Sequence, residues 1–194
     1  MRKLPRVLVL WGVPGVGKST FADWLVKEKG FVRVDSDAGG AGDTRAAKAW
    51  RGVLATLGTA QQFAALREFM KVAPYNPRPV VVEYGMLANE GGIGLLRLMR
   101  DDGAETWWFD GDHGAAFQAW KAENVKASRN MADAKWHEVV GIINDNTERI
   151  TEFFGNKMVR TIEAGSVHVP PEETFKAMFG GGDVSEGSAP GASK

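Results

Sequence analysis

The sequence predicts an α/β fold in which a parallel sheet is covered by helices on both faces. Apolar runs of strand length alternate with longer amphipathic stretches through most of the chain, and this alternation is typical of parallel sheets. Of the 194 residues, 44% are hydrophobic and 25% are charged, as in ordinary globular proteins. We therefore expect one domain with a substantial core.

Five apolar runs have the length and composition of buried strands. They are Arg6–Trp11, Phe31–Asp35, Pro79–Tyr84, Glu105–Phe109 and Val159–Glu163. The first run follows a basic start, as in a signal peptide, but it is short and enters a Gly/Pro turn. No run approaches the roughly 18 apolar residues of a membrane span, so we expect neither export nor membrane association.

Seven stretches between and after these runs have helical spacing. They are Lys18–Lys29, Thr44–Leu57, Gln61–Val72, Gly92–Arg100, Gly114–Ala127, Ala132–Phe154 and Pro171–Phe179. Gly58 separates the second stretch from the third, and Thr59-Ala-Gln-Gln62 has the pattern of a capping box. The sixth stretch predicts one long helix whose apolar stripe faces the core. Residues 180–194 are rich in Gly, Ser, Ala and Pro, which predicts a disordered tail.

The charges balance over the whole chain but not within it. Residues 1–100 carry 15 basic and 8 acidic side chains, and residues 101–194 carry 9 and 16. Chance distribution and an anion site in the first half both explain this split. The absence of cysteine excludes a disulfide scaffold, a thiolate zinc site and a cysteine nucleophile. It also fits a reducing compartment, so we expect a cytoplasmic protein. The oligomeric state stays open.

The segment Gly12-Val-Pro-Gly-Val-Gly-Lys-Ser19 matches the phosphate-loop pattern G-x-x-x-x-G-K-[ST]. It lies between a predicted strand and a predicted helix, which is the context that the motif requires. Backbone N–H groups would bind the phosphates, Lys18 would reach the β- and γ-phosphates, and Ser19 would ligate Mg²⁺. The predicted nucleotide-binding residues are Gly12, Val13, Pro14, Gly15, Val16, Gly17, Lys18, Ser19 and Thr20.

With this motif and with Val34-Asp-Ser-Asp37, the sequence resembles the small P-loop kinases that phosphorylate metabolites, nucleotides or polynucleotide ends. The acidic pair is similar to the Asp-x-Asp that closes the second strand in shikimate-kinase-like enzymes. The resemblance implies a three-layer P-loop NTPase fold with a five-stranded parallel sheet in the order 2-3-1-4-5. It also implies ATP and Mg²⁺ as cofactors, one kinase domain over residues 1–179 and a lid around residues 113–131.

The resemblance also suggests roles for the acids at the strand ends. Asp37 would be the catalytic base and Asp35 a metal-side residue, although which of the two is the base stays open. A solvated turn is the alternative for this pair. Glu83, at the end of the third run, is a second metal candidate and could instead contact the acceptor.

Basic residues complete the implied site. Arg129 would act from the lid on the transferring phosphoryl group, with Lys126 as second choice. Arg45 and Arg51 would bind an anionic group of the acceptor, and Lys126 and Asp37 are the other residues predicted to contact the acceptor. Surface salt bridges are the alternative for these residues. The three histidines have no metal-like spacing and are interpreted as capping or surface residues. Thr161–Gly165 and the following Val169-Pro-Pro resemble the last strand and adenine-side loop of small kinases.

The predicted function is an ATP- and Mg²⁺-dependent kinase that transfers the γ-phosphoryl group to a hydroxyl of a metabolite, nucleoside or nucleotide. One alternative is a nucleic-acid kinase acting on a polynucleotide 5′-hydroxyl or on a hydroxymethylated base in phage DNA. Neutral overall charge argues mildly against it. Another alternative is a P-loop ATPase switch that works through a partner. A GTPase is disfavoured because Ile143-Asn-Asp-Asn146 does not match the guanine-reading pattern Asn-Lys-x-Asp.

Overall fold

A mostly parallel sheet forms the centre of the computed structural model, which describes residues 3–35, 44–85, 87–126, 132–165 and 167–180. Its strand order is β2-β3-β1-β4-β5-β6. The strands are β1 (Val7–Gly12), β2 (Val32–Asp35), β3 (Val80–Glu83), β4 (Glu105–Gly111), β5 (Met158–Glu163) and β6 (Val167–His168). Strands β1 to β5 are parallel to one another, as predicted. Their order in the sheet confirms the predicted order 2-3-1-4-5.

The sheet has six strands, one more than predicted. The additional strand β6 pairs antiparallel with β5, and Ile162 lies opposite His168. Gly165 has a φ of 86°, a left-handed conformation that glycine adopts without strain and that helps the chain to reverse here. Two residues are too few to produce a periodic pattern, so the sequence did not indicate this strand.

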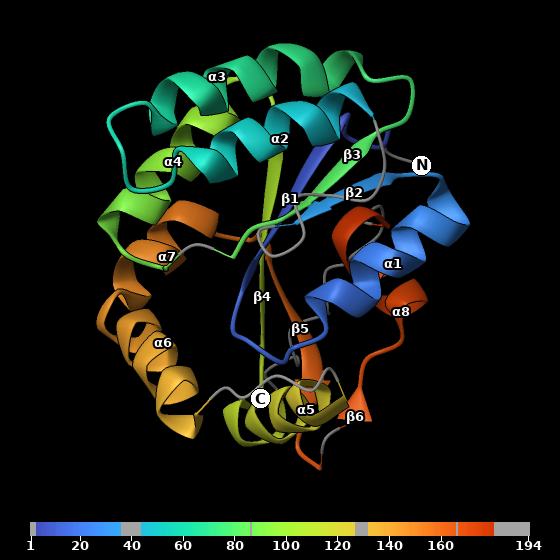
Figure 1. The fold of residues 1–194 in the computed structure, drawn as a ribbon. Coiled ribbons are helices and arrows are strands. Elements are labelled where there is room, and N and C mark those ends of the chain that lie inside the picture. The colour runs from blue at the N-terminus through green and yellow to red at the C-terminus, as the bar shows by residue number, and fades with distance from the viewer. Residues whose placement is uncertain (1–2, 36–43, 86, 127–131, 166, 181–194) are drawn as a thin grey trace, which may run out of the picture.

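Helices cover both faces of the sheet (Figure 1). They are α1 (Lys18–Lys29), α2 (Arg45–Ala55), α3 (Gln62–Val72), the 3-10 turn η1 (Ala73–Tyr75), α4 (Glu90–Asp101), α5 (His113–Lys126), α6 (Asp133–Asp145), α7 (Thr147–Phe154) and α8 (Pro171–Phe179). Helices α1 and α8 pack together on one face, and α2, α3, α4 and α7 lie on the other. The three predicted layers are therefore present.

Two details of the predicted helices are wrong. The stretch Ala132–Phe154 forms two helices, α6 and α7, which meet at Asn146. The Asn146 and Thr147 side chains donate to the carbonyls of Ile142 and Ile143, and such local bonds compete with a continuous helix.

The proposed capping box at Thr59 is also not formed. Helix α3 begins later, at Gln62, and the Gln62 side chain accepts a hydrogen bond from the amide of Gly58 rather than Thr59. The predicted break at Gly58 is confirmed, since its φ is 73°.

The core lies on both sides of the central strands. Val7, Leu8, Val9 and Leu10 of β1 are fully buried, as expected for a strand with neighbours on each side and helices on each face. Within the described ranges, no helix has the length and apolar character needed to cross a bilayer. The predicted tail lies almost entirely outside the described residues, which end at Gly180.

Candidate nucleotide-binding site

The phosphate loop joins the end of β1 to the start of α1. Gly12, Gly15 and Gly17 have φ values of 141°, 85° and 90°. A Cβ on Gly12 would lie 1.9 Å from the carbonyl oxygen of Phe109, and one on Gly15 would lie 2.0 Å from that of Ala116. Both the conformation and the close approach of neighbouring backbone therefore require glycine at these positions.

Five consecutive carbonyls of the loop accept hydrogen bonds from side chains. The bonds are Lys18 Nζ to Gly12 O (3.1 Å) and Val13 O (2.8 Å), Trp136 Nε1 to Pro14 O (3.3 Å), His168 Nε2 to Gly15 O (3.3 Å) and Thr161 Oγ1 to Val16 O (2.7 Å). The first amides of α1 have no acceptor within the helix. Because the carbonyls are engaged elsewhere, the loop offers N–H groups to an anion at the positive end of the α1 dipole.

Lys18 is the first residue of α1, and its side chain reaches back to the start of the loop. Burial lowers the pKa of the Lys18 ammonium to about 8, although the carboxylates of Glu83 and Glu123 act in the opposite direction. Its hydrogen bonds go to two carbonyls of its own loop. A phosphate would offer this ammonium a charged acceptor in place of the neutral carbonyls. The loop therefore favours the binding of an anion.

Two acids predicted for the site lie side by side at the carboxyl edge of the sheet. Asp35 of β2 is the direct register partner of Glu83 of β3. Ser19 Oγ, at the start of α1, donates a 2.6 Å hydrogen bond to Glu83 Oε1. The structure thus brings together Ser19, Asp35 and Glu83, which the sequence analysis had assigned to one metal site.

These oxygens fit Mg²⁺ by their chemistry. A hydroxyl and two carboxylates are hard donors, and magnesium in nucleotide sites takes only one or two protein carboxylates and completes its shell with phosphate oxygens and water. Across the described ranges, no group of three His, Asp or Glu residues is arranged as a metal cage. The Ser19 hydroxyl and the Glu83 and Asp35 carboxylates therefore suit a Mg²⁺ ion that arrives with a nucleotide.

Arg33 was not singled out from the sequence, but it contacts both acids. Arg33 NH2 lies 2.6 Å from Glu83 Oε2 and 3.5 Å from Asp35 Oδ2. Burial alone would lower the pKa of the guanidinium, but the carboxylates of Glu83, Asp23 and Asp35 outweigh it and raise that pKa. The available signal was an arginine between two apolar strand residues, two positions before Asp35 and hence on the same face.

The sequence predicts no loop contact for three residues: His168 is one of the histidines without metal-like spacing, Trp136 belongs to the apolar stripe of the sixth helical stretch and is expected to pack in the core, and Thr161 is part of the last predicted strand. The structure places all three on the phosphate loop. Trp136 is also buried, so packing was correctly predicted for it. These contacts come from β5, β6 and α6, and no local sequence pattern shows which side chains of distant elements meet a given loop.

A pocket of about 90 Å³ opens beside the loop on the α8 side. It is lined by residues of the loop and α1, of β5 and β6, and of the start of α8: Val16, Gly17, Thr20, Phe21, Thr161, His168, Val169, Pro170, Pro171 and Thr174. The structure therefore brings the predicted adenine-side segment next to the phosphate loop. The lining is mostly apolar, as in many small-molecule sites.

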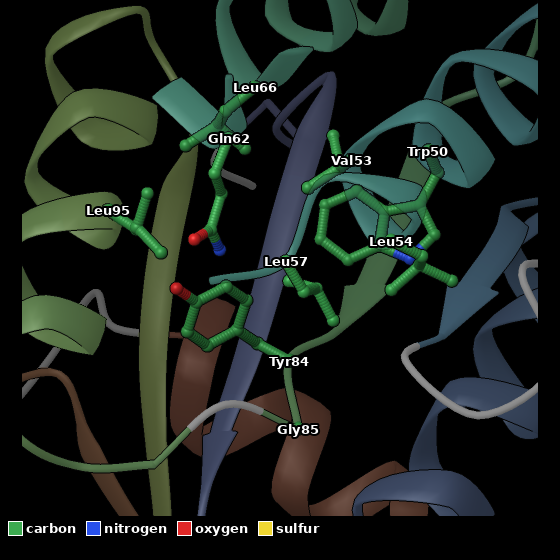
Figure 2. A pocket seen from close by; sticks show the side chains of 9 residues that line it. All are labelled: Trp50, Val53, Leu54, Leu57, Gln62, Leu66, Tyr84, Gly85 and Leu95. Atoms are coloured by element: carbon green, nitrogen blue, oxygen red, sulfur yellow. The ribbon is translucent and has the colours of Figure 1, made fainter. Parts of the chain in front are cut away.

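A second, smaller pocket of about 10 Å³ lies on the other face of the sheet, between α2, α3, α4 and the end of β3 (Figure 2). Its walls are mainly apolar, and the Gln62 amide and the Tyr84 hydroxyl point toward one another inside it. Burial raises the pKa of Tyr84. The volume suits a single water molecule. Trp50, in its wall, donates to the carbonyl of Asp35 and so connects this pocket to the end of β2.

The remaining predicted site residues fall into two groups. Asp37 and Arg129 lie outside the described residues, as does part of the lid at residues 127–131. Lys126 is exposed at the end of α5, and Arg45 and Arg51 lie on the exposed side of α2, away from buried Trp50. Acceptor binding by these three residues stays a prediction.

Comparison with known proteins agrees with this architecture. The family model described as an AAA domain matches residues 7–112, which is more than half of the chain and runs from β1 to the residue after β4. No curated protein sequence matches the chain.

Solved structures share the fold at low sequence identity. A gluconokinase from Sinorhizobium meliloti 1021 has a TM-score of 0.53 and 15% identity, covering 93% of both chains. A shikimate kinase from Acinetobacter baumannii, in complex with shikimate, has a TM-score of 0.52 and 11% identity, covering 90% of this chain and 92% of that one. The chain belongs to the AAA domain family and has the fold of the P-loop kinases.

Proposed function

We propose that this protein is an ATP- and Mg²⁺-dependent phosphotransferase that moves the γ-phosphoryl group to a hydroxyl of a small acceptor. The observation that carries the proposal is the contact between Ser19 of the phosphate loop and Glu83 at the end of β3. This contact places an acid of the sheet directly beside the residue that would meet the metal of a bound nucleotide.

The phosphates would lie against the loop amides, with Lys18 moving from its carbonyl partners to the β- and γ-phosphates. Mg²⁺, when bound, would offset the negative charge of the phosphates. Ser19 would contact it directly, and Glu83 and Asp35 would orient its water shell. The base of ATP would occupy the pocket between the loop and Val169-Pro170-Pro171, which lies on the opposite side of the loop from the acids.

The acceptor would approach between the ends of β2 and β3. Asp35 and Glu83 lie there, and Asp37 follows β2 two residues later. A carboxylate at this edge would accept or orient the proton of the acceptor hydroxyl as the oxygen attacks the γ-phosphorus, while the bond from that phosphorus to the β–γ bridging oxygen breaks and ADP leaves. Asp37 is the proposed base, with Asp35 as its metal-side neighbour. Arg129 and Lys126 are the proposed lid residues that would offset charge on the transferring group.

Label transfer from γ-labelled ATP tests this function directly. Separate reactions would contain sugars and sugar acids, nucleosides and nucleotides, oligonucleotides with a free 5′-hydroxyl, or hydroxymethylated duplex DNA. We expect labelled product with one class of small acceptor and none with Lys18→Ala. Label on DNA would support the nucleic-acid alternative instead. Label released only as free phosphate in every reaction, and accelerated by a partner protein, would favour an ATPase switch.

The role of the base is tested by a matched pair of variants. Asp37→Asn should leave ATP binding nearly unchanged and lower the transfer rate about 10²–10⁴-fold, the usual contribution of a positioned base. Asp35→Asn should mainly raise the Mg²⁺ concentration that the reaction requires. If Asp35→Asn lowers the transfer rate and Asp37→Asn raises the Mg²⁺ requirement, Asp35 is the base and Asp37 the metal-side residue. A wild-type transfer rate in both variants would show that neither acid is the base.

A further inference from the structure

Arg33 occupies an unusual place for a charged residue. It lies inside β2, between buried Val32 and Val34, and its side chain is only 22% exposed. Strand β2 is at the edge of the sheet, and the face that carries Arg33 and Asp35 is covered by α1. The guanidinium is therefore enclosed between the helix that follows the phosphate loop and the strand ends that carry the acids.

The guanidinium contacts a carboxylate on each side. Arg33 NH1 lies 2.6 Å from Asp23 Oδ1 on α1, and Arg33 NH2 lies 2.6 Å from Glu83 Oε2 on β3. Because the donors of arginine form a rigid planar fork, two such contacts fix the orientation of the whole group. Asp23 is one helical turn beyond Ser19, so the same helix supplies the anchor of Arg33 and the hydroxyl that meets Glu83.

Both carboxylate oxygens of Glu83 are consequently held. Oε1 accepts from Ser19 Oγ and Oε2 accepts from Arg33 NH2, each at 2.6 Å. The Glu83 and Asp35 side chains are each only 15% exposed and belong to register partners, so two like charges lie close together in a poorly solvated place. Like charges at such positions repel each other, and the Arg33 cation offsets this repulsion.

We propose that Arg33 is a positioning residue of the magnesium side of the site: it holds Glu83 directed at Ser19 and thereby sets the affinity of the nucleotide site for Mg²⁺. This inference rests on the proposed use of the site for Mg²⁺ and ATP. It assigns Arg33 no contact with the nucleotide or the acceptor. Residues that orient metal-side groups are often as important for metal affinity as the ligands themselves.

Positioning and plain electrostatics make opposite predictions here. If Arg33 acted only as a nearby positive charge, its removal would strengthen Mg²⁺ binding, because repulsion between two cations would be lost. If Arg33 acts by holding Glu83, its removal weakens Mg²⁺ binding. Arg33→Lys separates these effects further, because lysine keeps the charge but lacks the planar fork.

The experiment measures binding of a fluorescent ATP analogue over a range of Mg²⁺ concentrations, without any acceptor. For Arg33→Met we expect the half-saturating Mg²⁺ concentration to rise about tenfold, at the low end of effects seen for such residues. Arg33→Lys should shift it in the same direction, and affinity in EDTA should change little in either variant. Arg78→Met is the matched control, because Arg78 donates to the backbone carbonyls of Gly30 and Phe31, before the amino-terminal end of β2 and away from the acids at the carboxyl ends of the strands.

Tighter Mg²⁺ binding in Arg33→Met, or an equal shift in Arg78→Met, would overturn the proposal. Should Arg33→Met fail to fold, Arg33→Lys and Asp23→Asn keep the test decisive. Asp23→Asn removes the negative charge of the outer anchor of the guanidinium but keeps an acceptor oxygen, and should produce a smaller shift in the same direction. Since the assay needs no acceptor, a failure of label transfer would not affect it. If the wild-type protein transfers label and the Arg33 variants need no more Mg²⁺ than it does, the role of Arg33 is rejected while the proposed function stands.

Discussion

Lys18 shows at the scale of one residue how a binding site is prepared before its ligand arrives. Its ammonium is desolvated, and its hydrogen bonds go to two carbonyl oxygens that carry only partial charge. The buried charge is therefore poorly compensated, and its pKa falls to about 8. An incoming phosphate improves this compensation, so part of the binding free energy comes from relieving an unfavourable state of the free protein.

This pKa predicts a pH dependence of nucleotide binding. Phosphate favours the protonated amine, so binding above pH 8 requires proton uptake, and affinity should fall by up to about tenfold per pH unit there. Below pH 7 the amine is already protonated and Lys18 should contribute no dependence. Titration of a fluorescent ATP analogue between pH 6.5 and 9.5 measures the effect. Lys18→Met should bind the nucleotide weakly, and its affinity should not fall above pH 8. If the affinity of this variant still falls, the pH dependence belongs to another titrating group.

At the scale of elements, the phosphate loop depends on strands and helices that are distant in sequence. Thr161 is buried in β5, and its hydroxyl donates to Val16 O at 2.7 Å. Trp136 of α6 and His168 of β6 hold the two preceding carbonyls. The β5–β6 hairpin therefore has a defined role, since it closes one side of the loop and also lines the pocket proposed for the base of ATP.

Thr161→Val tests this support, because valine has the shape of threonine but no hydroxyl. A buried carbonyl left without its donor costs about 1–3 kcal/mol, so unfolding by urea should begin at lower denaturant. The binding of ATP should weaken several-fold as the loop loosens. Thr106→Val is the control: Thr106 is also buried, on β4, and this change should leave ATP affinity unchanged. Equal losses of affinity in both variants would contradict the proposed support.

Gly94 of α4 and Gly15 of the phosphate loop should respond in opposite ways to substitution by alanine. Gly94 lies inside α4, and a Cβ there would meet no atom within 4 Å. Gly94→Ala should stabilise the protein by up to about 1 kcal/mol, since alanine favours the helix and loses less backbone entropy on folding. Gly15→Ala should instead abolish ATP binding, because the added Cβ would lie 2.0 Å from the carbonyl oxygen of Ala116 and the φ of 85° at this position disfavours any side chain. Calorimetric unfolding and nucleotide titration measure the two effects, and destabilisation by Gly94→Ala would show an unseen constraint in α4.

At the scale of the whole molecule, the sheet makes one site from separate parts of the chain. Parallel strands all end at the same edge, so β1, β2 and β3 bring the phosphate loop, Asp35 and Glu83 together. The cations Lys18 and Arg33 and the acids of the site all belong to residues 1–100, the half of the sequence with an excess of basic residues. Part of that excess therefore lies at the proposed site.

Because the site draws on the whole sheet, ligand binding should stabilise the whole fold. Nucleotide at about 100 times its dissociation constant adds roughly 2.7 kcal/mol to the free energy of unfolding by mass action. We expect ATP with Mg²⁺ to raise the melting temperature by several degrees, ATP with EDTA to raise it less, and Lys18→Ala to abolish both shifts. An equal shift with and without Mg²⁺ would contradict a metal-assisted site.

Local patterns determined most of the fold and the core of the site. Strand and helix order follows from hydrophobic periodicity, and the phosphate loop follows from glycine spacing, because both depend on neighbouring residues. Strand β6 and the contacts of Arg33, Thr161, Trp136 and His168 were decided only by tertiary structure. Their contacts with the site join elements distant in sequence, so they depend on strand register and helix packing rather than on local pattern.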